Sequence, residues 1–144
     1  MFEQCAGSWV GANRLYFEGA DGPMLESPSH LTVAIVIGGF LQLSYDWIYE
    51  GNPKQGLILI GDDSGKATAA WVDSFHASKQ VMGCVGAAEA NVVNVKGSYT
   101  VAEGPDWGWR IHLELRGAEL RLTMFNISPD GQEFLAVLAV HHRV

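Results

Sequence analysis

The sequence predicts an all-β fold, a single antiparallel up-and-down barrel that takes up residues 1–144 as one domain and has no helical lid. Three observations predict this class. Glycine and proline clusters punctuate the chain at intervals of about ten residues, as turns between short strands do. Between the clusters, apolar and polar residues alternate with the period of two typical of a strand with two different faces. No segment has the spacing of a long amphipathic helix.

The expected strands lie between these turn clusters. Alternation is clearest over residues 41–50, where every odd position is apolar or aromatic, and residues 108–116 repeat the pattern. Residues 57–60 are apolar on both faces, which indicates deeper burial. We expect strands near 8–18, 29–37, 40–50, 55–62, 66–76, 79–87, 91–101, 108–116, 119–127 and 133–142, with one turn over residues 1–6 that closes an end.

Short connections in sequence order favour an up-and-down barrel over a Greek-key sandwich, which needs long crossings. Closing the sheet also removes its edges. Eight strands enclose an interior that side chains just fill or that holds one small ligand, and about ten strands should enclose more. The predicted shape therefore indicates a container for a small molecule.

Composition narrows the function further. Hydrophobic residues make up 48% of the chain and charged residues 17%, which excludes overall disorder. The net charge is −7 and the basic residues are scattered, which argues against nucleic acid as a partner. No apolar run approaches the roughly 20 residues of a membrane span. Two lone thiols, Cys5 and Cys84, are typical of a reducing compartment, so we expect a cytoplasmic protein. We also expect a monomer or a homodimer.

The Gly-x-Trp of residues 7–9, followed by Gly11, resembles the opening of lipocalins and related calycin barrels. In those proteins the Trp plugs the closed end and stacks under an Arg from a late strand. The resemblance implies that Trp9 has this role here, with Arg143 as its partner and Arg121 as the second choice.

A second resemblance is carried by residues 26–29, 38–40, 45–47, 49–51, 71–76, 97–99, 105–110 and 124–127. These stretches resemble one bacterial branch of that superfamily, the domain of unknown function 1579. The resemblance implies a lipocalin-like barrel and no established activity. The chain departs from the fatty-acid-binding relatives, which cover the barrel mouth with two helices. Residues 19–29 cannot form two helices, because the segment is too short and contains two prolines.

Residues 71–76 hold a Ser, a His and an Asp, the residue types of a hydrolytic triad. On one continuous strand, however, Asp73 faces away from Ser74 and His76, so a triad would need a bulge. Two interpretations of Asp73 and His76 remain. Either they are polar anchors for a ligand, or they bond to loop backbone at a capped turn.

Tyr45, Trp47 and Tyr49 form an aromatic stripe on one strand face. Such a stripe packs a core, and in a barrel with spare volume it also lines the cavity. In either case a buried tyrosine hydroxyl needs a partner.

The densest aromatic and charged cluster is residues 106–110. One interpretation is a portal in which Trp109 offers indole surface and Arg110 binds an anionic head group. The other is a tight turn, with Trp109 in the core and Arg110 solvated or paired. Asn126 interrupts an apolar face, so it either fixes a ligand or bonds to backbone near Pro129.

The leading hypothesis is a barrel that binds a small, mostly apolar ligand, without a cofactor or metal. A first alternative is a haem-binding or small-molecule-transforming barrel that uses a single His, and a second is a filled barrel with no ligand. His112, His141 and His142 are the haem-ligand candidates, although we expect terminal histidines to be solvated. The candidate ligand-binding residues are Tyr45, Trp47, Tyr49, Trp71, Asp73, His76, Trp109, Arg110 and Asn126.

Overall fold

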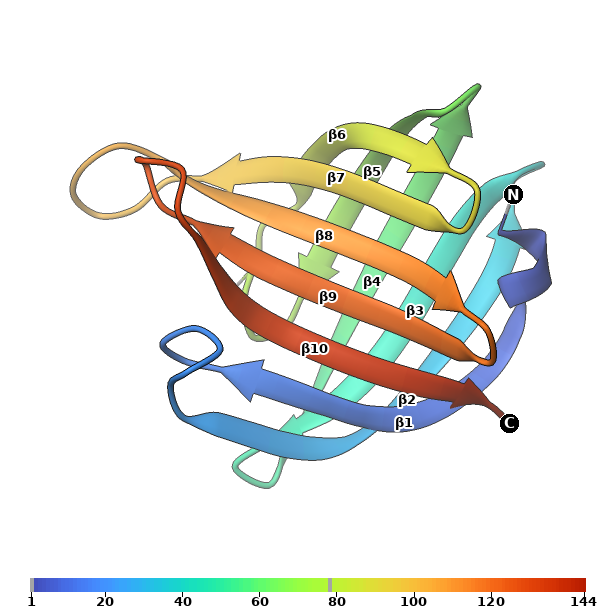
Figure 1. The fold of residues 1–144 in the computed structure, drawn as a ribbon, viewed down its shortest axis with the longest axis horizontal. Coiled ribbons are helices and arrows are strands. Elements are labelled where there is room, and N and C mark those ends of the chain that lie inside the picture. Colours follow the sequence, from blue (N-terminus) through green and yellow to red (C-terminus); the bar gives the residue numbers. More distant parts are fainter. Residues whose placement is uncertain (1, 78) are drawn as a thin grey trace.

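The computed structural model describes residues 2–77 and 79–144. A short 3-10 helix, η1 (Glu3–Cys5), precedes ten antiparallel strands that close into one barrel (Figure 1). Each strand pairs with the next along the chain, and the last pairs with the first, which confirms the predicted all-β up-and-down barrel. The strands are β1 (Gly7–Tyr16), β2 (Met24–Val36), β3 (Phe40–Tyr49), β4 (Asn52–Asp63), β5 (Lys66–Asp73), β6 (Met82–Glu89), β7 (Val92–Tyr99), β8 (Trp107–Arg116), β9 (Glu119–Ile127) and β10 (Glu133–Arg143).

The core lies inside the barrel and follows the period of two seen in the sequence. In β3 the odd positions from Leu41 to Trp47 are buried, and the even positions between them are more exposed. The turn from β3 into β4 is formed by Glu50 and Gly51, which both have positive φ, at 49° and 79°. That conformation suits the tight hairpin turns that match the strand twist.

One end of the barrel is closed by η1 and both chain termini lie there (Figure 1). The Arg143 guanidinium lies 4.4 Å from the centre of the Trp9 ring and donates to Ala6 O at 2.9 Å. Trp9 Nε1 donates to Cys5 O at 2.8 Å. Arg143 is therefore the partner of Trp9, as the resemblance implied. Arg121, the second choice, pairs with Glu119 instead.

Two strand boundaries differ from the prediction in a way that matters for function. β5 ends at Asp73 instead of residue 76, and β6 begins at Met82 instead of residue 79. The described residues between these strands, 74–77 and 79–81, belong to a loop at the open end of the barrel. In addition, β2 begins at Met24 instead of residue 29, because Met24 pairs with Tyr16 near the end of β1. The connection left between β1 and β2 is a loop, as expected for a barrel without a helical lid.

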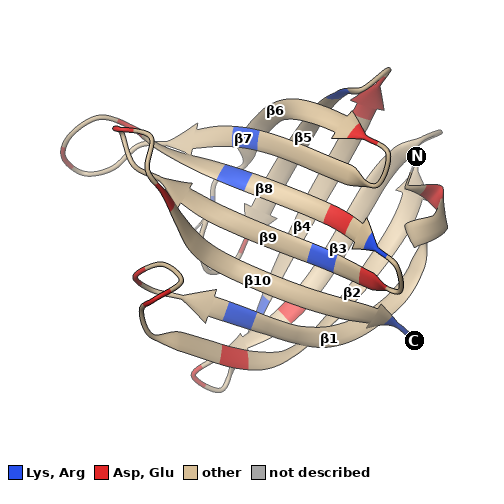
Figure 2. Ribbon diagram, in the orientation of Figure 1, with Lys and Arg blue, Asp and Glu red and all other residues tan. Residues whose placement is uncertain are grey.

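Lys and Arg residues are spread over several strands and interspersed with Asp and Glu in the view of Figure 2. Within the described residues, no helix has both the length and the apolar character needed to cross a membrane. Cys5 and Cys84 are both buried and free.

Candidate functional site

A cavity of about 480 Å³ lies at the end of the barrel opposite η1, which we call the mouth cavity. It is bounded by the loop after β5 and by the ends of β7, β8 and β9 that meet there. Its lining combines two tryptophans and a few aliphatic side chains with a larger number of polar side chains. The lining residues are Trp71, His76, Ala77, Gln80, Val81, Met82, Ser98, Tyr99, Thr100, Asp106, Trp109 and Asn126.

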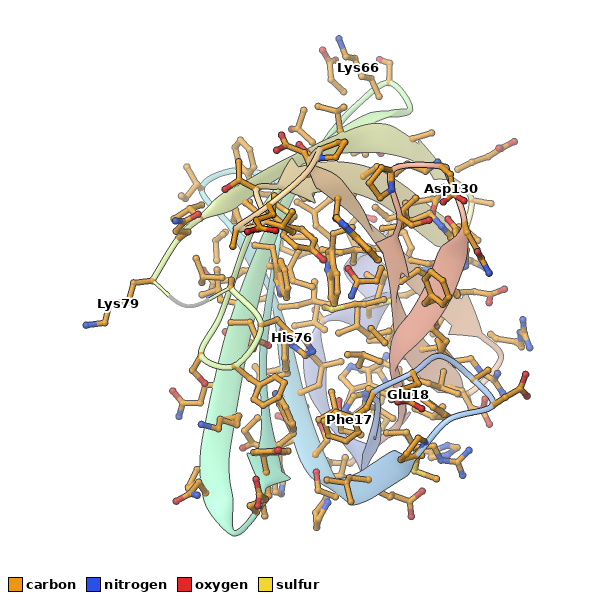
Figure 3. All side chains as sticks on the ribbon, turned by 90° about the vertical axis from the view of Figure 1, so that its left-hand side faces the viewer. Phe17, Glu18, Lys66, His76, Lys79 and Asp130 are labelled. Atoms are coloured by element: carbon orange, nitrogen blue, oxygen red, sulfur yellow. The ribbon has the colours of Figure 1, made fainter. Side chains whose placement is uncertain are left out.

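His76 reaches this cavity because Asp73 turns the chain. Asp73 is 4% exposed, and its Oδ1 accepts the backbone N–H groups of Phe75 at 2.7 Å and His76 at 3.0 Å. Side-chain bonds of this kind compete with the strand ladder and end it. The chain then curls back, so that the His76 ring points toward the barrel interior (Figure 3).

The expectation that His76 faces away from Asp73 was therefore wrong, because the strand does not continue past Asp73. The alternative of a turn capped by Asp73 is confirmed. In the folded chain His76 Nδ1 lies 3.4 Å from Asp73 Oδ1, an ion-pair distance. The other ring nitrogen, Nε2, consequently points away from the carboxylate. Ser74 takes no part, since its Oγ accepts the N–H of Gln55 on the neighbouring strand.

The second oxygen of Asp73 is held by Tyr45. The Tyr45 hydroxyl donates to Asp73 Oδ2 at 2.7 Å, and Trp71 Nε1 donates to the same hydroxyl at 3.0 Å. In the strand register, Tyr45 pairs with Gly56 and Gly56 pairs with Asp73. The three positions form one row across β3, β4 and β5, and the glycine leaves room for the phenol to cross it.

The protonation states in this row follow from burial and charge. Burial acts to raise the pKa of Asp73, but the contacts with His76 and Tyr45 outweigh it, so the pKa is lowered overall. Burial, together with the Asp73 charge, raises the pKa of Tyr45 well above its usual value. Asp73 is therefore an ionised acceptor at neutral pH, and Tyr45 a protonated donor.

Aromatic rings surround the His76 side chain. The ring centres of Trp109, Trp47 and Trp71 lie 5.2, 5.9 and 6.0 Å from that of His76. Trp71 and Trp109 also stack, with centres 5.0 Å apart and planes 10° apart. Within residues 2–77 and 79–144, Nδ1 of His76 and Nε1 of Trp109 are buried without a hydrogen-bond partner. The site thus combines apolar walls with unsatisfied polar atoms.

Four of the nine residues expected from the sequence line the mouth cavity, namely Trp71, His76, Trp109 and Asn126. Oδ1 of Asn126 accepts a hydrogen bond from the Tyr99 hydroxyl at 2.5 Å, where the second interpretation expected backbone near Pro129 as the partner.

Three more of the nine do not line the cavity but hold His76 in place. Trp47 and Asp73 contact the His76 ring, and Tyr45 donates to Asp73. Tyr49 lies farther out and packs on Phe75, with ring centres 4.8 Å apart.

Arg110 is the residue that the structure separates from the others. It lies on the opposite strand face from Trp109, where its Nε is 2.8 Å from Glu133 Oε2. Its guanidinium also lies 4.1 Å from the centre of the Phe125 ring. Arg110 is thus paired on the outer wall, as the second interpretation of this cluster predicted, and it does not line the mouth cavity.

Tyr99 is a lining residue that the sequence analysis did not single out. A signal was present, because Val93, Val95 and Tyr99 share one strand face and the two valines are buried. Ala77 and Gln80 line the cavity from the loop after β5, where no periodicity could have indicated them.

The remaining histidine candidates lie elsewhere. His141 was expected to be solvated and is instead fully buried, because β10 is paired on both sides nearly to its end. Its Nε2 lies 2.8 Å from Ser29 Oγ. His142 is exposed, and His112 lies on the outer face beside Glu114. None of the three lines the mouth cavity, so a haem there does not fit these candidates.

A larger hollow of about 580 Å³ lies over the outer wall of β2 to β5. Outward-facing side chains such as Thr32, Ser44 and Val72 form much of its lining. It touches Tyr45 and Asp73 from outside, through the gap at Gly56, but their polar atoms already have partners. The mouth cavity is the better candidate, because it is lined by Trp109, whose buried Nε1 has no hydrogen-bond partner.

Comparison with known proteins gives a family and a fold. A family model described as "Protein of unknown function (DUF1579)" matches residues 1–143. No curated protein matches the chain.

Among solved structures, the chain is similar to Rv2717c from M. tuberculosis, with a TM-score of 0.68 and 15% identity over 99% of this chain and 94% of that one. This likeness supports the barrel fold alone. A putative thioesterase II from Thermobifida fusca YX is 8% identical over 92% of this chain and 77% of that one. Its TM-score of 0.24 carries no argument.

Proposed function

Because the chain belongs to the DUF1579 family, whose description assigns no function, we propose its function from the site itself: it is a lipocalin-like barrel that binds a small, mostly apolar molecule in the mouth cavity. The observation that carries the proposal is the indole nitrogen of Trp109, Nε1, which is buried without a hydrogen-bond partner within an aromatic wall of the cavity. An unsatisfied buried polar group costs about 1–3 kcal/mol. Folding tolerates that cost where a bound molecule recovers part of it.

The cavity has the size and lining of a small-molecule site. Its volume of about 480 Å³ lies within the range of roughly 300–1,000 Å³ usual for ligand pockets. Trp71, Trp109 and Met82 supply apolar surface. Such sites pair an apolar wall with a few placed polar groups that fix the orientation of the ligand.

The polar lining indicates what the ligand carries. The Tyr99 hydroxyl donates to Asn126 Oδ1, so the oxygen of this amide is already occupied. The amide nitrogen of Asn126 is left as a donor on the cavity wall. We therefore expect an apolar body with a hydrogen-bond acceptor, such as a carbonyl oxygen, placed against Asn126.

Titration with Prodan tests the proposal. This naphthalene carries a propionyl and a dimethylamino group, and its emission shifts to the blue in an apolar site. We expect a saturable blue shift with the native protein. Ala77→Leu fills the cavity and should weaken binding by at least about tenfold, since overpacking a pocket costs roughly 1–3 kcal/mol.

Ala70→Leu is the matched control, because it makes the same substitution on the outer face of β5, away from the mouth cavity. It should leave the Prodan affinity unchanged. Equal affinities for the native protein, Ala77→Leu and Ala70→Leu would place the probe outside the mouth cavity and refute the proposal.

A further inference from the structure

We infer that His76 and Asp73 act as a general base that removes a proton from the molecule bound in the mouth cavity. The substrate class is a planar, mostly apolar carbon acid, in which a C–H bond is activated by a neighbouring electron-withdrawing group. The inference rests on the proposed function, since it needs a ligand in this cavity. It adds an activity to what would otherwise be a binding protein.

The first support is the orientation of the imidazole. His76 Nδ1 faces Asp73 Oδ1 at 3.4 Å, and the ring lines the cavity. A carboxylate beside Nδ1 favours the tautomer with the proton on that nitrogen. The lone pair is then on Nε2, the nitrogen that faces away from the carboxylate, where a general base needs it.

The second support is that Asp73 is held more firmly than a turn requires. Capping the turn uses only Oδ1, which accepts the N–H groups of Phe75 and His76. Oδ2 is bound separately by the Tyr45 hydroxyl, which in turn is bound by Trp71 Nε1. A capping role explains the first set of bonds, and the second set satisfies the buried Tyr45 hydroxyl. Together the two sets fix both oxygens of Asp73, and so they hold its charge in place beside the imidazole of His76.

The third support is the surrounding medium. Trp47, Trp71 and Trp109 pack around the His76 ring, whose side chain is 14% exposed. In a site with little water, the Asp73 charge stabilises an imidazolium more than it would in solvent.

Other ionisable groups near His76 are few. Asp73 comes from β5, Tyr45 from β3, Tyr99 from β7 and Asp106 from the rim before β8. Of these, Asp73 alone lies within ion-pair distance of the ring. Lys79, in the same loop, points away from the cavity into solvent (Figure 3).

The proposed step is a single proton transfer. Nε2 of His76 takes the proton, and the electron pair of the C–H bond stays with the substrate, either delocalised into its electron-withdrawing group or used to expel a leaving group. The imidazolium next to ionised Asp73 then returns the proton to product or to water. No oxidant, reductant or second substrate is needed.

A nitrobenzisoxazole tests the step directly. Loss of its ring C–H proton to a base breaks the N–O bond and releases a coloured cyanonitrophenolate. We expect turnover above the buffer rate. His76→Ala should lower kcat by about 100-fold or more, within the usual contribution of a general base. Added imidazole should restore part of the rate in His76→Ala, which a purely structural role would not allow.

Two further variants test the positioning residues. Tyr45→Phe removes the donor to Asp73 Oδ2, and Asp73→Asn removes the charge while keeping an acceptor for the turn. Both should lower kcat and leave KM and Prodan affinity unchanged, with Asp73→Asn the larger effect, at least about tenfold. His112→Ala, which removes an outer-face histidine, should leave the rate unchanged.

The outcomes separate the two claims. Prodan binding in the cavity together with His76-dependent turnover supports the general base. Prodan binding without turnover, or with turnover that survives His76→Ala, refutes the general base and leaves the binding function intact. Failure of Prodan to bind the cavity refutes both.

Discussion

The hydroxyl of Tyr45 reaches the carboxylate of Asp73 at 2.7 Å, although a whole strand separates β3 from β5. Gly56 of that intervening strand stands between them in register. A Cβ atom added to Gly56 would lie 2.1 Å from both Cζ and Oη of Tyr45. One missing side chain on β4 therefore permits the hydrogen bonds that support His76.

Gly56→Ala should disturb this row. The new methyl group has to displace the Tyr45 ring, and the displaced hydroxyl then loses Asp73. Overpacking and a broken buried hydrogen bond together should lower the free energy of unfolding by about 2–4 kcal/mol. Urea unfolding measures the loss. Near-ultraviolet circular dichroism should also report the moved rings.

Gly83→Ala is the matched control for Gly56→Ala. It too lies within a strand, but a Cβ atom added there meets nothing within 4 Å, and its φ is not in the left-handed region. We expect its stability to be unchanged or slightly raised, since alanine lowers the entropy of the unfolded chain. A similar loss in both variants would contradict the explanation based on the Tyr45 ring.

Arg143→Ala should loosen the closed end of the barrel. The guanidinium stacks on Trp9 and donates to backbone carbonyls, Ala6 O at 2.9 Å and Gln4 O. We expect a loss of about 1–3 kcal/mol, from the cation–π contact and the charged hydrogen bonds. Arg121→Ala removes a partly exposed pair with Glu119 and should cost less than about 1 kcal/mol. Thermal unfolding of both variants at one pH distinguishes them.

The general fold could be predicted because each strand carries its own signal. Alternation in β3, turn glycines and the absence of helical spacing act locally, and strands joined by short turns pair with their neighbours. The Trp9–Arg143 contact was also predictable, but only through the resemblance to calycin barrels, since nothing local relates positions so far apart.

The candidate site was predicted in composition but not in arrangement. Periodicity placed Asp73 and His76 on opposite faces of one strand. A pattern of alternation gives no sign that the Asp73 side chain accepts backbone N–H groups and so ends the strand. Gly56 was a readable signal, since a glycine inside a strand often marks a close approach. Its partner in that approach, Tyr45, depended on register, which the sequence does not state.

Arg110→Ala tests the sequence-based interpretation of Arg110 as an anchor for an anionic group. Because Arg110 pairs with Glu133 on the outer wall, its loss should leave Prodan affinity within about twofold and cost about 1 kcal/mol of stability or less. Asn126→Ala, which removes a donor from the cavity wall, should weaken Prodan binding instead. Fluorescence titration of both variants gives the comparison, and the reverse order of effects would restore Arg110 to the site.

His141 should make stability depend on pH in mildly acidic solution. Burial lowers the pKa of His141 from 6.5 to about 4 in the folded protein. Between these values the unfolded chain binds a proton that the folded protein does not, so acid favours unfolding. The stabilisation is fully present above about pH 6.5 and is lost as the pH falls toward 4. The full loss is about 3 kcal/mol at 1.36 kcal/mol per pH unit.

Two histidine variants isolate this effect, because the carboxylates titrate mostly below this range. His141→Gln keeps a polar group near Ser29 but cannot take up a proton, so its unfolding free energy should vary about 3 kcal/mol less between pH 7 and 4. His142→Gln removes the exposed neighbour and should retain the native slope. Burial also lowers the pKa of His112, but that contribution is common to all three proteins and cancels in the comparison. Urea unfolding at a series of pH values measures the slopes. Identical slopes for His141→Gln and the native protein would mean that His141 is not the buried neutral base that its contact with Ser29 indicates.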